Sequence, residues 1–258
     1  MNYLLFRLYG PMASWGEIAV GENRHSADYP SKSAITGLLG AALGISRNDD
    51  LAQKMLADNY SLAVQQVAAG GFMQDYHTTQ VPDSTGKFRY RTRRDELVLG
   101  RKRLHTILSQ REYQTDALAV VAVKAGAQAR WTLEQLKNAL LKPRFHLYLG
   151  RKACPLAAPL QPELVEANGF WQALTLYKPA PLLNDNRPWV TDENLLEYSS
   201  CCRYYWQGDE GEFATPEELK ERKVQQVVRH DQPLSRQRWQ FQSRKENLWA
   251  PTDRSEGC

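Results

Sequence analysis

The stretch from residue 86 to residue 104 constrains the fold more than any other feature of this chain. Its sequence is GKFRYRTRRDELVLGRKRL, with eight Lys and Arg residues and two acids, whereas the whole chain of 258 residues has a net charge of +4. The remaining residues, taken together, are therefore slightly acidic. Burying so many like charges would strip each of them of its hydration. We therefore expect this segment to project from the body of the protein as a hairpin.

Arginines alternate with other residues inside this segment. Arg89, Arg91 and Arg93 are each preceded by an aromatic residue or a threonine. In a strand, this spacing places three guanidinium groups on one face and two rings and a methyl group on the other. A return strand from about Leu97 would complete a hairpin at about residues 78–110. Solvated surfaces usually mix charges of both signs, so the pattern favours contact with phosphates and stacked bases over a solvated face.

The rest of the sequence predicts an α+β fold. The N-terminal residues form an apolar run that ends at Gly10 and indicates a largely buried strand. Ser31 is a good N-cap for one helix, and Thr132 is a good N-cap for another. A turn-rich segment leads into the basic hairpin, and the further strands are expected at residues 60–70, 116–125 and 145–150. This order of elements is typical of ferredoxin-like, RNA-recognition-type domains.

The character of the chain changes after residue 150. Pro-rich loops follow, with short strand candidates in FWQALTLY (170–177) and KVQQVVRH (223–230). We therefore expect residues 1–150 to form the ferredoxin-like domain with its protruding hairpin. Residues 151–258 are expected to form a smaller region that is rich in β-strands and loops.

Composition excludes several classes of protein. The sequence contains no apolar run of the length that spans a membrane, and its N-terminus reads as a strand and not as a signal peptide. The four cysteines do not have the spacing of a disulfide framework or of a C-x-x-C metal site. We expect a cytoplasmic protein without a metal or another cofactor.

Two further segments could contact phosphates. The sequence KPRFHLYLGRKACP (142–155) brings Arg144, Arg151 and Lys152 close to aromatic residues. In a strand, Arg144 and His146 would share one face, although charges of this kind also protect the edge of a sheet. The start of the helix after Ser31 offers free N–H groups beside Arg24 and Lys32, which resembles a phosphate cradle but lacks the P-loop pattern.

The sequence gives little support for catalysis. Tyr76 and His77 are adjacent, and metal-independent RNA cleavage can use such groups as acid and base. A single His beside a Tyr is usually structural, however. The carboxylates are scattered, and neither G-x-S-x-G nor H-E-x-x-H occurs. Cys154 has no evident base partner in the sequence, which favours a structural thiol.

Several motifs, in order along the chain, are similar to those of one known family. They are an opening like LRLYGPMASWG at Leu5–Gly16, then YPSKSAITGLLGAALGI, DYHT, REYQTDA and KPRFHLYLGRKACPL. Together they resemble the CasD-type subunit of Cascade, the type I-E CRISPR surveillance complex. The similarity spans most of residues 3–160. The C-terminal hundred residues match weakly, although RHDQP and SRQRW have plausible counterparts.

The resemblance implies a fold and a role. Such subunits have a ferredoxin-like domain with a protruding hairpin, the thumb, and a smaller C-terminal β region. They hold the 5′ handle of the crRNA, and the thumb kinks the RNA at the boundary between handle and spacer. Their neighbours are the backbone subunit and the large PAM-reading subunit. The thumb of this chain is longer and more basic than the family leads us to expect, which is compatible with a further contact to target DNA or to a variant large subunit.

We therefore expect a non-catalytic crRNA-binding subunit of a type I-E-like Cascade complex. The alternative is a metal-independent endoribonuclease that processes repeat RNA, as a related type I-C protein does, with Tyr76 or His77 in acid–base roles. A general single-strand-binding protein is a third possibility. The predicted RNA contacts are Arg24, Lys32, Tyr76, His77, Arg89, Arg91, Arg93, Arg101, Arg103, Arg111, Arg144, Tyr148, Arg151 and Lys152.

Overall fold

A computed structural model describes most of the chain. The described residues are 1–19, 21–83, 89–98, 101–183, 187, 189–196, 198–215, 223–235, 238 and 240–250, without the side chains of residues 198–201. Within these ranges no helix is long and apolar enough to cross a membrane. Phe88, which was predicted to lie on the strand face opposite the arginines, is outside the described residues, as is Lys87.

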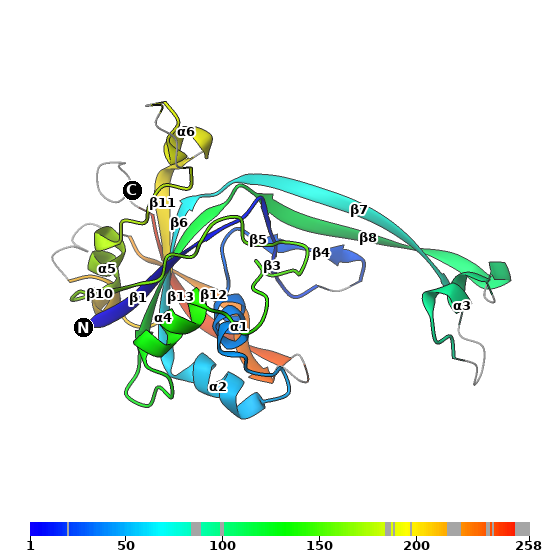
Figure 1. The fold of residues 1–258 in the computed structure, drawn as a ribbon, viewed down its shortest axis with the longest axis horizontal. Coiled ribbons are helices and arrows are strands. Elements are labelled where there is room, and N and C mark those ends of the chain that lie inside the picture. The colour runs from blue at the N-terminus through cyan, green and yellow to red at the C-terminus, as the bar shows by residue number, and fades with distance from the viewer. Residues whose placement is uncertain are drawn as a thin grey trace.

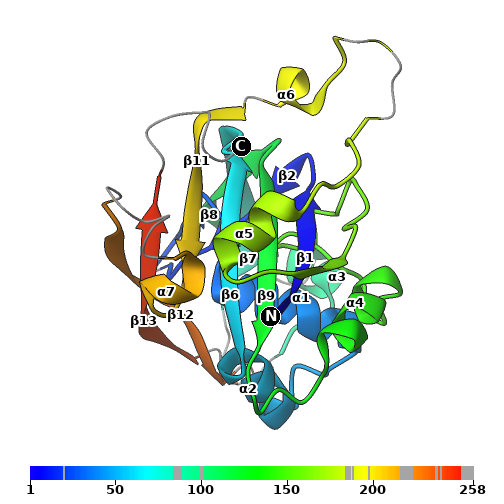
Figure 2. The same ribbon diagram turned by 90° about the vertical axis from the view of Figure 1, so that its left-hand side faces the viewer.

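A seven-stranded antiparallel sheet forms the body of the protein (Figures 1 and 2). In spatial order its strands are β10 (Glu163–Glu166), β1 (Asn2–Tyr9), β9 (Leu118–Ala125), β6 (Tyr60–Ala68), β11 (Tyr198–Trp206), β13 (Gln240–Trp249) and β12 (Gln225–Ser235). The C-terminal strands β11, β12 and β13 therefore extend the same sheet that the N-terminal half begins.

Helical segments join the first four strands of this order. The chain runs from β1 through α1 (Lys32–Leu43) and α2 (Asp50–Asp58) to β6, and from β9 through α4 (Leu133–Leu141) to β10. The expected caps are present, since the Ser31 hydroxyl accepts a hydrogen bond from Ala34 N–H and Thr132 forms a capping box. Numbered along the chain, these four strands have the order 4-1-3-2.

The strand expected at residues 145–150 was wrong. These residues make only an isolated bridge, between Tyr148 and Pro155, and β10 is the strand that pairs with β1 at the edge of the sheet instead. Leu147 and Leu149 are buried while Tyr148 is half-buried, which produces the alternation of a strand. Their backbone groups bond to neighbouring loops instead of a strand, as the contact between Ser14 N–H and the Leu149 carbonyl oxygen shows.

Two hydrophobic cores cover the two faces of the sheet. Leu4, Phe6 and Leu8 of β1 point toward α1, α2 (Asp50–Asp58) and α4, because alternate residues of a strand face opposite sides. Tyr3 and Leu5 point to the other side, toward α5 (Phe170–Leu176) and α7 (Glu210–Phe213). Figure 2 shows α5 in front of the sheet and α1 behind it.

The strand expected in FWQALTLY was also wrong, because this segment forms α5. Phe170, Ala173, Leu174 and Tyr177 are buried, and their spacing is that of one helical face. By contrast, the candidate in KVQQVVRH is confirmed as the first part of β12. Cys154 is a buried free thiol.

A long hairpin leaves the sheet and ends in a helical tip (Figure 1). Its strands are β7 (Gly71–Pro82) and β8 (Leu104–Thr115), which pair without interruption from Gly71 opposite Thr115 to Pro82 opposite Leu104. The hairpin is thus longer than the expected range of 78–110, and its first strand occupies residues predicted to be turn-rich. Two short strands, β2 (Met12–Ala13) and β4 (Asn23–Arg24), add to β8 near the body.

The tip is helical and not a pair of strands. It contains α3 (Arg93–Val98) and the 3₁₀-helix η1 (Arg101–Arg103), so Arg89, Arg91 and Arg93 do not form the expected row on one strand face. Reciprocal bonds start α3: Thr92 Oγ1 accepts from Asp95 N–H, and Asp95 Oδ2 accepts from Thr92 N–H. This T-x-x-D arrangement is a capping box that the alternation of arginines obscures.

The remaining elements are short. β3 (Trp15–Gly16) pairs with β5 (Ser26–Ala27) beside the foot of the hairpin, and α6 (Asp192–Leu195) lies in the long connection before β11. The short strands β2 to β5 place the loop after β1 against the hairpin, because β2 and β4 both pair with β8.

Replacing Gly70 with Ala should destabilise the fold. Gly70 joins β6 to β7 at a φ of +69°, and an added Cβ would lie 2.1 Å from the Thr115 carbonyl oxygen. We expect the free energy of unfolding to fall by about 2 kcal/mol or more, measured by urea denaturation. Gly16→Ala is the matched control, since no atom lies within 4 Å of its added Cβ. Equal stability of the two variants would contradict this role of Gly70.

Candidate nucleic-acid interface

Three arginines from separate segments meet at the foot of the hairpin. Arg24 of β4 lies opposite Arg111 of β8 in a parallel pair. Arg151 Nη2 donates to the Arg24 carbonyl oxygen at 3.3 Å, and its guanidinium group lies 4.8 Å from the centre of the Tyr113 ring. Arg24 and Arg111 are exposed, as is the adjacent Lys152. We call Arg24, Arg111, Arg151 and Lys152 the base cluster.

The backbone conformation of Gly150 positions the loop that carries Arg151 and Lys152. Gly150 has a φ of +82°, and an added Cβ would lie 1.8 Å from the Ser14 carbonyl oxygen. The loop then closes through Cys154 N–H, which donates to the Arg151 carbonyl oxygen at 2.9 Å. Only glycine fits both the positive φ and the close approach. The segment predicted as a strand thus presents its cations from a tight loop.

A carboxylate fixes the loop that carries Arg24. Glu112 Oε2 accepts from Ser26 N–H at 3.1 Å, and Glu112 Oε1 lies 2.8 Å from His25 Nδ1. Ser14 Oγ also donates to the Glu112 carbonyl oxygen at 3.0 Å. These contacts hold the residues around β4 against β8, so Arg24 stays level with Arg111.

Tyr76 and His77 lie near the base cluster but on opposite faces of β7. His77 shares the face of Asp75 and Arg111, and its Nε2 lies 2.9 Å from Asp75 Oδ2. Tyr76 points to the other face and is 57% exposed. Successive residues of a strand face opposite sides, so these two side chains cannot act together on one phosphate.

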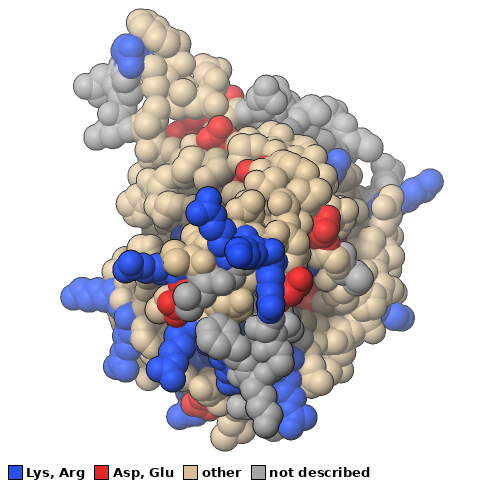
Figure 3. Space-filling model, turned by 90° about the vertical axis from the view of Figure 1, so that its right-hand side faces the viewer, with Lys and Arg blue, Asp and Glu red and all other residues tan. Residues whose placement is uncertain are grey.

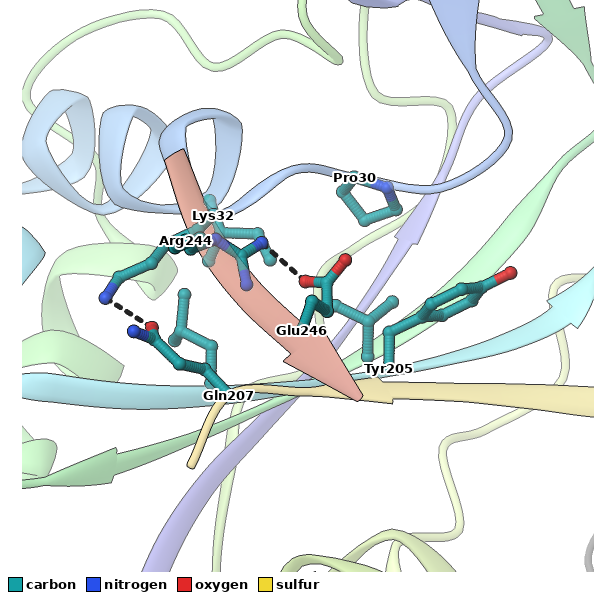
Figure 4. Close-up of a pocket in the computed structure, with 9 residues that line it drawn as sticks. Pro30, Lys32, Tyr205, Gln207, Arg244 and Glu246 are labelled. Carbon is teal, nitrogen blue, oxygen red and sulfur yellow. Dashed lines mark hydrogen bonds and ion pairs between the residues drawn. The ribbon is translucent and has the colours of Figure 1, made fainter. Parts of the chain in front are cut away.

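Lys32 lies inside the protein. Its side chain is 6% exposed, and Nζ donates to Gln207 Oε1 at 2.7 Å (Figure 4). Asp231 Oδ2 accepts from Lys32 N–H at 2.7 Å, so a carboxylate of this chain already occupies the N-terminus of α1. The phosphate cradle expected there is therefore filled by the protein itself.

A buried ion network surrounds Lys32. Arg244 contacts both oxygens of Asp231, at 2.6 and 2.9 Å, and its Nη2 contacts Glu246 Oε1 (Figure 4 shows the Glu246 contact). Burial alone would lower the pKa of Arg244, but the hydrogen bonds that Arg244 donates to Asp231 and the charge of Glu246 outweigh burial and raise the pKa. Tyr29 Oη donates to Glu246 Oε2 at 2.5 Å. This network fastens β12 and β13 to the start of α1.

Arg144 supports the other end of α1. Its aliphatic stem packs so closely on Gly44 that an added Cβ there would lie 2.6 Å from Arg144 Cδ. Arg144 N–H donates to the Ala42 carbonyl oxygen at 3.0 Å. A cation at the C-terminal end of a helix also complements the helix dipole. The exposed Arg144 therefore lies apart from the base cluster as part of the packing of α1, while Tyr148 is half-buried in its bridge to Pro155.

The other predicted arginines gather at the far end of the hairpin. Figure 3 views this end and shows Lys and Arg side chains crowded in the middle of the view. We call the described cations at residues 89–103 the tip cluster; they are Arg89, Arg91, Arg93, Arg94, Arg101, Lys102 and Arg103. Arg94 and Lys102 were not among the predicted contacts, although their positions in the basic segment could have indicated them.

The buried network was also missed. Asp231, Arg244 and Glu246 lie far apart in the sequence or on alternate positions of an ordinary charged strand, and no local pattern marks them as buried. The one available signal was RHDQP, the weakly matching motif that contains Asp231. Within the described part of the chain, no three His, Cys, Asp or Glu residues group as metal ligands.

Burial of Lys32 should make stability depend on pH. Burial, reinforced by the charge of Arg244, lowers the pKa of Lys32 from 10.5 to about 8. Between these values the unfolded state binds more protons, so the free energy of unfolding rises with pH. We expect the wild type to gain about 1 kcal/mol relative to Lys32→Met from pH 7 to pH 9, measured by urea denaturation. Parallel pH profiles of the two proteins would contradict this assignment.

Comparisons with known proteins agree with the resemblance inferred from the sequence. The family described as CRISPR-associated protein (Cas_Cas5) matches residues 3–245. The CRISPR system Cascade subunit CasD of Escherichia coli (strain K12) is 35% identical over 187 residues, which cover 69% of this chain and 78% of that protein.

Solved structures show the same fold. A chain of a CRISPR RNA-guided surveillance complex has a TM-score of 0.62 and 22% identity, and the match covers 99% of this chain and 93% of that chain. The crystal structure of a Cas protein has a TM-score of 0.56 and 23% identity, with 99% and 97% covered. The chain therefore belongs to the CRISPR-associated protein (Cas_Cas5) family.

Proposed function

We propose that this chain is a non-catalytic, crRNA-binding subunit of a type I-E-like Cascade complex in the cytoplasm. It caps the 5′ handle of the crRNA, and its hairpin kinks the RNA at the boundary between handle and spacer. The observation that carries this proposal is the base cluster, where Arg24, Arg111 and Arg151 converge from three segments. Membership of the family and the similarity to CasD support it.

The handle would lie along the base cluster. Guanidinium groups bind phosphate oxygens through two parallel hydrogen bonds, and the exposed Arg111 and Arg24 could do so, with Arg24 Nη1 also donating to the Ala19 carbonyl oxygen at 3.4 Å. Lys152 would add an exposed ammonium group as a point charge. Of the other predicted contacts, His77 shares the face of Arg111, and the exposed Tyr76 ring is available for stacking on a base. Tyr148 is the remaining residue that we propose as an RNA contact. In this proposal the handle site does not include the predicted contacts at the tip, which lie further along the hairpin in α3, in η1 and just before α3; they are Arg89, Arg91, Arg93, Arg101 and Arg103.

We propose the division of the chain at about residue 150 that the sequence suggests, with one change: β10 (Glu163–Glu166) belongs to the sheet of the first domain. The strand order 4-1-3-2 with its helical connections supports a ferredoxin-like class for this domain, with β7 and β8 as its thumb. Residues 151–258 would form the smaller region, whose strands β11 to β13 extend the sheet. The backbone subunit and the large PAM-reading subunit would be its neighbours in the complex.

The endoribonuclease alternative has less support. Acid–base cleavage needs two groups that reach the same phosphate. Tyr76 and His77 point to opposite faces of β7, and His77 Nε2 lies 2.9 Å from Asp75 Oδ2. The geometry therefore favours positioning of RNA over proton transfer.

Removing the exposed cations of the base cluster should weaken RNA binding through its electrostatic part. Each phosphate contact to a single strand adds about 0.7 to the slope of log affinity against log salt. Replacing Arg24, Arg111 and Lys152 with Ala should therefore flatten the slope for repeat RNA by about 2, measured by fluorescence anisotropy. Lys54, Lys142 and Lys178 are exposed elsewhere, and replacing them with Ala makes the same change of net charge. A slope unchanged from wild type in the base variant would refute the proposed site.

The catalytic alternative can be tested on the same RNA. Incubated with repeat RNA and EDTA, the wild-type chain should retain the RNA at full length, because Tyr76 and His77 point to opposite faces of β7 and cannot act on the same phosphate. His77→Ala should leave the RNA length distribution unaltered. Cleavage at a fixed position by the wild type, lost in His77→Ala while binding persists, would establish the endoribonuclease instead.

A further inference from the structure

The tip cluster has more positive charge than its own acids can balance. Of the described residues there, Arg93 pairs with Glu96 at 2.6 Å, and Asp95 accepts from the backbone N–H groups of Arg91 and Thr92. Both acids are therefore engaged. The other cations are exposed and have no carboxylate partner within the described part of the chain; they are Arg89, Arg91, Arg94, Arg101, Lys102 and Arg103.

An uncharged shaft separates the tip cluster from the base cluster. Residues 78–82 of β7 and 104–110 of β8 contain no Lys or Arg. Arg103 precedes Arg111 by eight residues, which corresponds to about 26 Å along a strand. The Debye length at physiological salt is about 8 Å, so the two clusters act as separate electrostatic sites. A ligand held only at the base would gain little from the tip.

The tip fits a polyanion whose charge lies on its surface. It is the projecting end of the hairpin, as Figure 1 shows, and five of its six unbalanced cations are arginines. Single-stranded nucleic acid is usually held in a groove with rings that stack on bases. Tyr90 is the one aromatic side chain among the described tip residues, and it is half-buried.

We infer that the tip cluster binds the phosphate backbone of a double-stranded nucleic acid, at a site separate from the base cluster. A duplex presents one negative charge per about 1.7 Å, on an outer surface that a projecting cationic end can reach without opening the strands. The contact is independent of sequence, since it involves phosphates and not base edges. The shaft allows the duplex and the handle RNA to be bound at the same time.

Charge-removal variants of the full chain test this inference. The probes are a labelled DNA duplex of mixed sequence and the repeat RNA, each measured by fluorescence anisotropy over a salt series. Replacing Arg94, Arg101 and Arg103 with Ala should flatten the salt slope for the duplex by about 2 to 3 and weaken its binding by about tenfold or more. The affinity for repeat RNA should stay unchanged.

Two control variants separate this inference from the proposed function. The base variant (Arg24, Arg111 and Lys152 to Ala) should lose affinity for repeat RNA and keep its affinity for the duplex. The variant at Lys54, Lys142 and Lys178 has the same net charge and should bind both probes as the wild type does. If the base variant keeps its RNA affinity while the tip variant loses the duplex, the proposed function fails and the tip site stands.

Three results would overturn the tip site. The first is a wild-type chain that does not bind the duplex, and the second is a tip variant whose salt slope for the duplex is unchanged. The third is a tip variant that binds both probes normally but no longer associates with partner subunits in a pull-down. In that case the tip would be a protein-docking surface.

Discussion

The close approach of Gly70 to Thr115 fixes where the hairpin leaves the sheet. An added Cβ at Gly70 would lie 2.1 Å from the Thr115 carbonyl oxygen, so the two strands of the hairpin are in backbone contact where they emerge. β6 and β9 are inner strands of the sheet, and each continues directly into the hairpin. The direction of the hairpin is therefore set by the sheet. Arg111, four residues before Thr115 in β8, is placed at the foot of the hairpin by this constraint.

The carboxylates of the chain decide which of its cations remain available to a ligand. Asp231 occupies the N-terminus of α1 and also pairs with Arg244, so the helix end beside Lys32 has no room for a phosphate. Glu112 bonds to Ser26 N–H and holds the loop of Arg24, but it does not neutralise the arginines on the opposite face of β8. The same kind of side chain thus closes one expected site and builds another.

The sequence was sufficient for those elements that local patterns specify. The buried strand at the N-terminus, the helices capped by Ser31 and Thr132, and the protruding hairpin were all predicted. Local patterns failed where two structures share one pattern: Leu147 and Leu149 alternate as in a strand but lie in a loop that only tertiary contacts define. The site was partly predictable. Exposed arginines could be named from charge clustering, but no sequence pattern reveals that Lys32 is buried by strands nearly two hundred residues later.

The net charge of +4 conceals how charge is distributed in this molecule. Most of the excess lies at one end of the hairpin, and a smaller group lies at its foot. An unbroken ladder of backbone hydrogen bonds from Gly71 to Pro82 keeps these two groups apart, because a paired two-stranded ribbon holds its length better than a flexible loop of the same residues. The shaft therefore needs no charge to serve the interface. Its contribution is the distance it imposes, which exceeds the range over which the two groups could act as one.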